Sequence, residues 1–392
     1  MKKIGWLIIL CLTLMSCNTQ EVNNTENEIT DTIINTTEVN DTDEDSNEST
    51  NTAEETTEDT TEDTTEETTE ETAEETTEET TEETTEVEEV DYTALYNEYK
   101  VNEAGQVIVI MYHNLSEKEG TYASTPDLFR ADLERLYSEG YRTVSMSDLI
   151  NNTIDIPMGT TPVVLTFDDG TKSNFYYEED GTIGKDSVVG IMDEFYKTHE
   201  DFGRNAIFYL YGTNPFREKE LLQQKLEYLI DNGYEIGTHT FGHDELNNLS
   251  AEGIQKTLGR NEQFIQALIP DHQMKHLSLP YGLRPKGDLE SYLYNGTYEE
   301  LTYEIVSAVN VGWNPIASPA SVKFDASSIN RITCGSDEAE LHYWLDYFVN
   351  KPERRYYSDG DPSTIVVPVD QLESVNDKYL EQVITYEESG DE

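Results

Sequence analysis

Short apolar runs alternate with helical patterns along most of the chain beyond residue 105. The runs at 107–112 and 163–167 are continuous, bounded by polar residues, and short, which is typical of buried strands. Between them, residues 126–139 carry apolar side chains three to four positions apart, which predicts an amphipathic helix. The chain therefore begins its patterned part as strand, helix and strand.

The same alternation continues to about residue 281. We expect further strands at 206–211 and 234–237, helices near 187–198, 218–231 and 250–268, and a strand leading into Leu279-Pro280-Tyr281. Strands that alternate with helices indicate an α/β fold with a parallel sheet, and about 300 residues are enough for one barrel-sized domain. Beyond Tyr294 the pattern is less regular, and elements there are hard to place.

The N-terminus has a different pattern. Two lysines precede an apolar stretch over residues 4–15, and Ser16-Cys17 follow. This is the layout of a secretory signal peptide, and the stretch is shorter than the roughly 20 apolar residues that cross a bilayer. The end of the stretch, Leu14-Met15-Ser16-Cys17, resembles a bacterial lipobox, which implies cleavage before Cys17 and a lipid on its thiol. Ordinary signal cleavage is the alternative, but a polar segment starts directly after Cys17.

Residues 18–90 form a second part of the chain. They contain 29 Asp and Glu residues and no Lys or Arg, and 54–86 repeat Thr-Thr-Glu-Glu with little variation. With few apolar residues to bury, and with charge of one sign, such a segment is expected to stay disordered and extended. We therefore divide the chain into a lipoprotein signal peptide (1–17), a disordered acidic linker or tether (18–90) and a folded domain (91–392).

Charge and cysteine content limit the partners. The chain has 81 acidic and 25 basic residues, a formal net charge of −56. Nucleic acid is an improbable partner for so acidic a protein, whereas a neutral or basic ligand suits it. If Cys17 carries a lipid, Cys334 is the one cysteine left in the domain, so no internal disulfide is expected there.

Three of the predicted strand ends are followed by residues that suit metal binding or catalysis. Asp168 and Asp169 follow the run at 163–167, and two adjacent carboxylates are costly unless a cation or a shared proton relieves them. His239 and His243 follow the run at 234–237, four residues apart, and can reach one metal ion. Leu-Pro-Tyr-Gly, with Tyr281, is a tight turn that can aim a backbone N–H into a pocket. In parallel α/β folds, functional residues gather beyond the carboxyl ends of strands.

Together these segments resemble the NodB-homology polysaccharide deacetylases, the carbohydrate esterase family four enzymes. Thr166-Phe167-Asp168-Asp169-Gly170 is similar to the first motif of that family, and His239-Thr240-Phe241-Gly242-His243 to its second. Leu279-Pro280-Tyr281-Gly282 is similar to the end of its third motif. The resemblance covers roughly residues 105–285. It implies a distorted (β/α) barrel of seven or eight strands.

Carried over by position, the resemblance also implies roles. Asp169, His239 and His243 would be the ligands of a divalent metal, most often zinc. Asp168 would be the general base, and the Tyr281 backbone N–H would help to bind the oxyanion. Three nitrogen and oxygen ligands leave one metal position open for water, as in catalytic zinc sites.

The third motif departs from the family pattern in one place. The family has an arginine two residues before the proline, where it holds the catalytic aspartate, and this chain has Ser278 there. Arg331 or Arg284 could supply the guanidinium from elsewhere in the sequence.

The proton donor for the leaving amine is also not obvious. No segment clearly matches the family's last motif, Leu-x-His. His342 falls in an amphipathic segment, which favours helix packing, and His113, at the end of the first strand, is the other candidate. The fourth motif is not recognisable, and Trp313 is at most an aromatic wall of the pocket.

These observations favour a metal-dependent deacetylase on the outer face of the plasma membrane. Its substrate would be an N-acetylglucosamine-containing polysaccharide of the cell surface or its surroundings, such as peptidoglycan. A glycan- or cell-wall-binding lipoprotein with the same fold but impaired catalysis is the alternative, because the arginine and the acid histidine of the family are missing from their usual places. A metal amidohydrolase acting on a small amide is less favoured, since a long tether suits a polymer.

Overall fold

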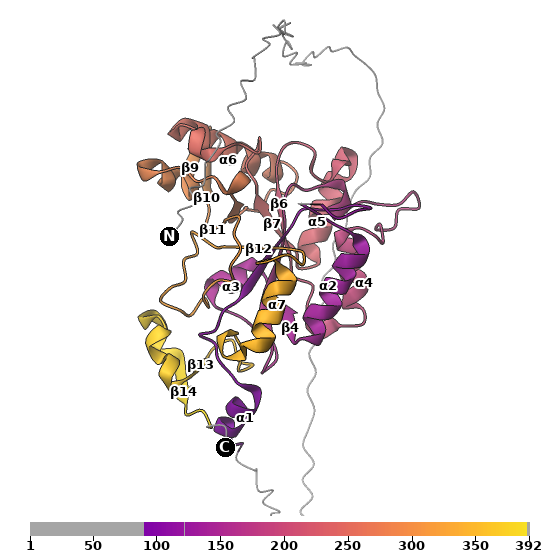
Figure 1. Cartoon of the computed structure of the whole chain (residues 1–392). Helices are drawn as coiled ribbons and strands as arrows, with labels where there is room; N and C mark the ends of the chain where they lie inside the picture. The colour runs from indigo at the N-terminus through magenta and orange to yellow at the C-terminus, as the bar shows by residue number, and fades with distance from the viewer. Residues whose placement is uncertain (1–89, 121, 390–392) are drawn as a thin grey trace, which may run out of the picture. The chain divides into compact units, whose positions relative to one another are not determined.

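The computed structural model describes residues 90–120 and 122–389 (Figure 1). The predicted signal peptide, the lipidation at Cys17 and the acidic tether as far as residue 89 lie outside these residues and stay predictions. Within the described part of the chain, no helix is both long and apolar enough to cross a membrane.

An eight-stranded, fully parallel sheet forms the centre of the domain. Seven of its strands are neighbours in the order β11-β8-β7-β6-β5-β1-β12, and β4 pairs with the start of β5. The strands are β1 (Ile108–Tyr112), β4 (Tyr141–Thr143), β5 (Thr161–Phe167), β6 (Ile207–Leu210), β7 (Glu235–Thr238), β8 (His276–Ser278), β11 (Ser307–Val309) and β12 (Ile332–Thr333).

The sheet closes on itself through the segment that enters β12. Ile329 accepts a hydrogen bond from the Asn310 N–H and donates one to the Ala308 carbonyl, at 2.7 and 2.9 Å, which ties the segment to β11. Three residues later Ile332 pairs with Ile110 of β1. The predicted distorted (β/α) barrel is therefore confirmed, with a ring of seven strands and β4 attached outside the ring order.

Alternate residues of each strand face the inside and the outside of the barrel. In β1 and β5, Val109 and Val164 pack in an interior cluster, whereas Ile108 and Leu165 belong to the outer core under the helices. This period of two is what a strand between two apolar layers requires. It also decides where the next residues along each strand will point.

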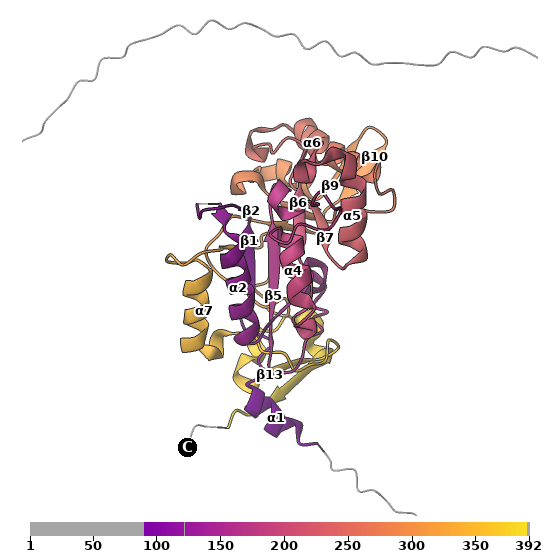
Figure 2. The ribbon, with the colours of Figure 1, turned by 90° about the vertical axis from the view of Figure 1, so that its right-hand side faces the viewer.

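Helices cover the outside of the barrel on β1, β5, β6 and β7. In Figure 2, α7, α2 and α4 lie side by side along this face. The outer helices are α2 (Pro126–Ser138), α4 (Val188–Tyr196), α5 (Leu222–Asp231) and α7 (Leu341–Asn350). The short α3 (Met146–Asn151) instead packs on the interior cluster through Met146 and Leu149. Each of α2, α3 and α4 begins at a Ser or Thr whose side chain accepts a hydrogen bond from the first turn.

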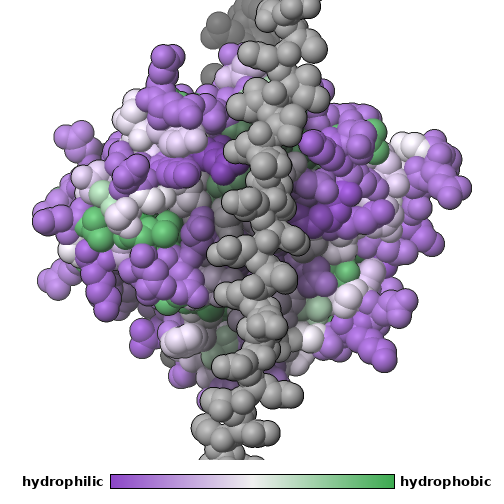
Figure 3. Space-filling model, turned by 90° about the horizontal axis from the view of Figure 1, so that it is seen from above, coloured by the Kyte–Doolittle hydropathy of each residue, from purple (hydrophilic) through white to green (hydrophobic). Residues whose placement is uncertain are grey.

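Two smaller units flank the barrel. At one end α6 (Ala251–Gln266) packs on the antiparallel hairpin of β9 (Asn295–Tyr298) and β10 (Leu301–Glu304). At the other, α1 (Tyr92–Tyr99) packs against the parallel pair β13 (Ile365–Pro368) and β14 (Val383–Tyr386), where the rings of Tyr96 and Tyr386 are 5.7 Å apart. Hydrophilic side chains cover most of the face seen in Figure 3, with separate apolar patches between them.

Candidate metal centre and active site

Three potential metal ligands meet beyond the carboxyl ends of β5 and β7, two barrel strands that are separated by β6. One carboxylate oxygen of Asp169 and one nitrogen each of His239 and His243 lie within 4.8 Å of one another. Asp169 Oδ1 is 3.6 Å from His239 Nε2 and 3.5 Å from His243 Nε2. The sequence therefore predicted a group of side chains that the fold does bring together.

The donor set fits a divalent ion such as zinc. Zinc bonds of about 2.0–2.2 Å in a tetrahedron place neighbouring ligand atoms about 3.4 Å apart, close to the separations between Asp169 and the two imidazoles. Two imidazoles and one carboxylate are also a ligand combination found in catalytic zinc sites, where the fourth position remains open.

The orientation of His239 agrees with this use. Its Nδ1 lies 2.8 Å from the Ser278 carbonyl oxygen, so Nδ1 carries the proton and donates it, and Nε2 faces Asp169 as a free lone pair. His239 is buried, and burial lowers its pKa, which favours the neutral imidazole that a metal requires.

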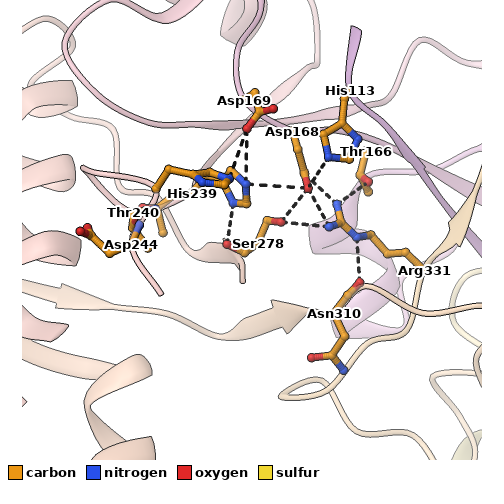
Figure 4. A network of polar contacts seen from close by, with 12 residues as sticks. His113, Thr166, Asp168, Asp169, His239, Thr240, Asp244, Ser278, Asn310 and Arg331 are labelled. Carbon is orange, nitrogen blue, oxygen red and sulfur yellow. Dashed lines mark hydrogen bonds and ion pairs between the residues drawn. The ribbon is translucent and has the colours of Figure 1, made fainter. Parts of the chain in front are cut away.

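Asp168 lies beside the cluster but is held by an arginine. Arg331 forms a bidentate ion pair with it, Nη1 to Oδ1 at 2.7 Å and Nη2 to Oδ2 at 2.8 Å (Figure 4). Both side chains are buried. Burial alone would raise the pKa of Asp168, but Arg331 and then His239 outweigh it and hold that pKa well below its usual value. Asp168 is therefore ionised and accepts protons rather than supplying them.

The sequence offered two arginines, Arg331 and Arg284, as partners of Asp168, and the structure shows that Arg331 is the one that contacts it. Arg331 precedes β12 by one residue, and its Nε donates to the Asn310 carbonyl oxygen at 3.0 Å. Ser278, the residue at the family's arginine position, donates its hydroxyl to Asp168 and accepts from Arg331, both at 3.0 Å. Arg284 instead contacts Glu290, Tyr294 and Ser327, so it does not hold Asp168.

The strand alternation explains why these side chains meet. Val109 and Val164 face the barrel interior, so residues two and four positions further along each strand face the same way. His113 and Asp168 occupy those positions at the carboxyl ends of β1 and β5. Tyr112 and Phe167, one residue earlier, belong to the outer core.

His113 faces Asp168 from the side opposite the metal cluster. Its Nε2 is 3.9 Å from Asp168 Oδ2, and its ring lies 4.8 Å from the ring of Tyr122. Burial lowers the pKa of His113, and the nearby Asp168 opposes that effect only in part. His113 therefore lies beside Asp168, on the side away from the metal-type ligands.

His342 lies elsewhere, in the first turn of α7. Its Nε2 is 2.7 Å from Asp132 Oδ1, and Asp132 also accepts a hydrogen bond from the Tyr112 hydroxyl at 2.8 Å. The expectation that His342 serves helix packing agrees with these contacts. Trp313 is 64% exposed after β11, so it is no enclosed wall.

The turns that carry the site use unusual backbone conformations. Asp169, Thr240, His243 and Tyr281 have φ values of 74°, 62°, 54° and 58°. Left-handed backbone is unfavourable for residues other than glycine and tends to occur at functional sites. Tyr281 is also the second residue of a 3₁₀ turn, where an amide has no partner inside the turn, so its N–H is available to a ligand.

Sequence reasoning missed two parts of the site. The hydroxyl of Ser278, singled out only as a missing arginine, is part of the Asp168 network. Tyr211, which follows β6, lies with its ring 5.2 Å from that of His243 and 6.3 Å from that of His239. Tyr209 faces the barrel interior, and side chains two residues apart in a strand face the same way. The alternation along β6 could therefore have indicated that Tyr211 reaches the site.

Comparisons with known proteins point to one family. Residues 155–296 match the family model described as polysaccharide deacetylase. A Bacillus subtilis (strain 168) protein with the name "Putative polysaccharide deacetylase YxkH" is 21% identical to this chain over 184 residues. That match covers 47% of this chain and 59% of the relative, so it spans less than two thirds of the relative's length.

Solved structures with similarity to this chain are also deacetylases or their relatives. A Streptococcus pyogenes deacetylase in complex with acetate shares 16% identity with a TM-score of 0.43, covering 62% of this chain and 97% of that one. A Bacillus cereus polysaccharide deacetylase shares 16% identity with a TM-score of 0.45, covering 62% and 68%. A carbohydrate esterase family four pseudoenzyme of Bacillus anthracis shares 22% identity with a TM-score of 0.21, covering 26% and 33%.

The stretch that matches the family model contains both carboxylates, both metal-type imidazoles and the Tyr281 turn. By that match, the chain contains a polysaccharide deacetylase domain over residues 155–296.

Proposed function

We propose that the chain is a metal-dependent deacetylase that hydrolyses N-acetyl groups of an N-acetylglucosamine-containing polysaccharide. One juxtaposition carries the proposal. Three metal-type donors lie next to a fourth group, Asp168, that is kept ionised by Arg331 and is not needed as a ligand. A metal site alone would serve binding, whereas a metal site with an adjacent base suits hydrolysis.

In this proposal Asp169, His239 and His243 hold the ion, and zinc is the ion that this donor set fits best. When bound, such an ion lowers the pKa of a coordinated water to about 7 and polarises the acetamide carbonyl. Asp168 takes the proton from the attacking water, because its carboxylate faces the cluster and stays ionised.

The remaining steps fall to residues around the pocket. The Tyr281 N–H donates a hydrogen bond to the oxyanion that forms when the carbonyl carbon becomes tetrahedral. His113, whose Nε2 lies 3.9 Å from Asp168 Oδ2, relays the proton that Asp168 took from the water to the departing amine nitrogen. The C–N bond then breaks, and acetate and a free amino sugar leave.

The missing family arginine supported the alternative of a glycan-binding protein without turnover. Arg331 supplies a bidentate guanidinium to Asp168, so that argument no longer favours loss of activity. We therefore propose the enzyme and make the binding protein an outcome of the test.

The test is acetate release from chitooligosaccharides and from peptidoglycan, with the zinc-loaded wild type, the Asp168→Asn variant and the chelated protein side by side. We expect acetate from the wild type alone. Metal content, measured on the same samples, should be unchanged in Asp168→Asn and lost after chelation. A wild type that binds zinc and glycan but releases no acetate from any of these polymers would contradict the enzymatic proposal.

We further propose that the mature protein is lipid-anchored at Cys17 on the outer face of the plasma membrane, with the acidic segment as a spacer. The lipobox-like sequence supports this proposal. Cells that express Cys17→Ser should release the protein into the medium, while the wild type stays in the membrane fraction. Equal release of both would rule the anchor out.

A further inference from the structure

The turn that carries both proposed histidine ligands has a conformation that its own residues do not favour. It spans residues 239–243 directly after β7, and Thr240 and His243 have φ values of 62° and 54°. Residues other than glycine keep a left-handed backbone only where the surrounding structure fixes it. The turn therefore needs contacts from outside itself, and helix α6 supplies them.

Thr257 of α6 contacts the middle and the end of this turn. Its hydroxyl oxygen accepts a hydrogen bond of 3.0 Å from the Phe241 N–H, which also donates to the Thr257 carbonyl oxygen at 3.1 Å. The same hydroxyl donates to Asp244 Oδ2, and Asp244 Oδ2 accepts from the Gly242 N–H at 3.2 Å. One hydroxyl group thus links α6 to the residue next to His243.

Asn261 lies one helical turn further along α6, on the same face, and contacts the start of the turn. Its Nδ2 donates to the Leu210 carbonyl oxygen at 2.8 Å and to the Thr238 hydroxyl at 2.9 Å. The His239 N–H donates to the same Leu210 carbonyl at 2.9 Å, and the Thr240 N–H donates to the same hydroxyl at 3.2 Å. Asn261 therefore holds the backbone on both sides of His239.

The backbone matters most for His243, because little else holds its ring. Within the described residues no hydrogen bond reaches that ring, whereas His239 Nδ1 is held by the Ser278 carbonyl. The His243 ring is bordered by the rings of Tyr211 and Tyr281, at 5.2 and 4.6 Å. A metal site needs its ligands within about 0.5 Å of the productive geometry. The position of His243 Nε2 therefore depends on the turn.

Packing of α6 alone does not explain these two polar side chains. Thr257 and Asn261 are 7% and 1% exposed, and Asn261 Oδ1 has no hydrogen-bond partner among the described residues. Leaving a buried polar atom unpaired is unfavourable, so an apolar side chain of similar size would serve packing better. What the asparagine contributes instead is the two donor contacts of its amide nitrogen, both to the backbone and side chain that flank His239.

We propose that Thr257 and Asn261 are positioning residues of the metal centre. From α6 they fix the turn, so that both imidazoles are in place before an ion binds, and they thereby raise the affinity for zinc. The inference rests on the proposed function, because it takes Asp169, His239 and His243 as the metal ligands. It requires no turnover.

The experiment measures zinc affinity, by competition with a chromophoric chelator, for the wild type, Thr257→Val, Thr257→Ser and Asn261→Leu. Valine keeps the shape of threonine without its hydroxyl, so the side-chain contacts with the Phe241 N–H and Asp244 are lost. We expect zinc binding to weaken about tenfold in Thr257→Val and in Asn261→Leu, as when a group that orients a metal ligand is removed. Thr257→Ser restores the hydroxyl and should bind zinc nearly as tightly as the wild type.

Ser250→Ala is the matched control. Ser250 caps α6 by accepting a hydrogen bond of 3.2 Å from the Gly253 N–H, so its loss weakens the helix without touching the turn. This variant should unfold at a lower urea concentration and yet bind zinc as the wild type does. Circular dichroism first shows that every variant is folded under the conditions of the zinc measurement.

The outcomes separate this inference from the proposed function. Wild-type affinity in both Thr257→Val and Asn261→Leu overturns the positioning role and leaves the proposed metal centre intact. Equal weakening in Ser250→Ala also overturns it, because the effect would then come from the stability of the helix. A wild type that binds no zinc removes both this inference and the metal centre on which it rests. Weakened zinc binding that Thr257→Ser restores supports the inference even if the wild type releases no acetate.

Discussion

At the residue scale, the most informative group is the guanidinium of Arg331, which donates hydrogen bonds to both carboxylate oxygens of Asp168. Arg331 is 163 positions from Asp168 in the sequence, yet it completes a buried network that also includes Ser278 and Thr166. Breaking a buried ion pair by removing one partner leaves the other charge uncompensated. The network therefore links the ionisation of the proposed base to the stability of the barrel.

Replacing Arg331 by methionine should make both effects visible. Without the guanidinium, burial raises the pKa of Asp168, so the acid limb of the pH profile of kcat/KM should move to higher pH, and the rate at neutral pH should fall. Unfolding in urea should show a loss of about 3–5 kcal/mol.

The control for this change is Arg284→Met, because Arg284 is also partly buried but contacts Glu290 and Tyr294. It should leave the acid limb in place. If both variants keep the wild-type acid limb, Arg331 does not control the base.

The sequence allowed some site residues to be predicted better than others for a physical reason. Asp168 with Asp169, and His239 with His243, are close in sequence, so a single strand end fixes each pair. Arg331 comes from a separate strand, and pattern alone could not choose between it and Arg284. Only the closure of the barrel decides which arginine reaches Asp168.

At the scale of elements, long and strongly patterned segments were predicted well. The run predicted at 163–167 is β5 (Thr161–Phe167), and the helix predicted at 126–139 is α2 (Pro126–Ser138). The barrel strands beyond residue 294 were not placed because they are short: β12 has two residues and β11 three. Strands of that length are formed by their partners, so they carry too little pattern of their own.

Helix α7 illustrates how such late elements attach. Its first turn is joined to α2 by the contact between His342 and Asp132, and Asp132 is buried between α2 and Tyr112. The hydrogen bond to Asp132 raises the pKa of His342 above its ordinary value of 6.5. The folded protein therefore binds a proton at His342 more tightly than the unfolded chain does.

The sign of the resulting pH dependence follows directly. A raised folded-state pKa stabilises the protein fully below the unfolded pKa of about 6.5, and this stabilisation is lost as the pH rises through the folded value. The difference in unfolding free energy between wild type and His342→Gln should therefore be larger at pH 5.5 than at pH 9, as measured by urea unfolding.

His272 provides a control of opposite sign, because burial lowers its pKa. Its contribution should be present at high pH and decrease on acidification, so the difference between wild type and His272→Gln should grow with pH. A His342→Gln difference that does not change with pH would mean that the contact with Asp132 does not depend on the charge of His342.

At the scale of the whole molecule, the alternation of strands and helices predicted the parallel sheet but not the order of its strands. Hydrophobic pattern shows which face of a strand is buried, and it does not identify the neighbouring strand. The insertion of β12 between β11 and β1 depends on hydrogen bonds across the ring, such as that between Asn310 and Ile329. The family resemblance, in contrast, implied the closed barrel, and the structure confirms it.

The charge of the molecule leads to a prediction about the product of the proposed reaction. Residues 91–392 contain 52 of the 81 acidic residues and 23 of the 25 basic ones, so the domain itself is strongly negative. Each deacetylation replaces a neutral acetamide by an amine that is protonated at neutral pH. A deacetylated oligomer should therefore be attracted to the domain, while the acetylated oligomer is not.

Salt distinguishes this attraction from ordinary competition for the site. The screening length falls from about 10 Å at 0.1 M salt to about 3 Å at 1 M, so inhibition by glucosamine oligomers should weaken markedly over that range, whereas KM for neutral N-acetylated oligomers should stay nearly constant. Monomeric glucosamine, with one charge, should show a much smaller salt effect than a hexamer, because screening acts on each of the hexamer's charges. Inhibition by the hexamer that is independent of salt would mean that product binds through local contacts alone, and that the negative charge of the domain has no part in product release.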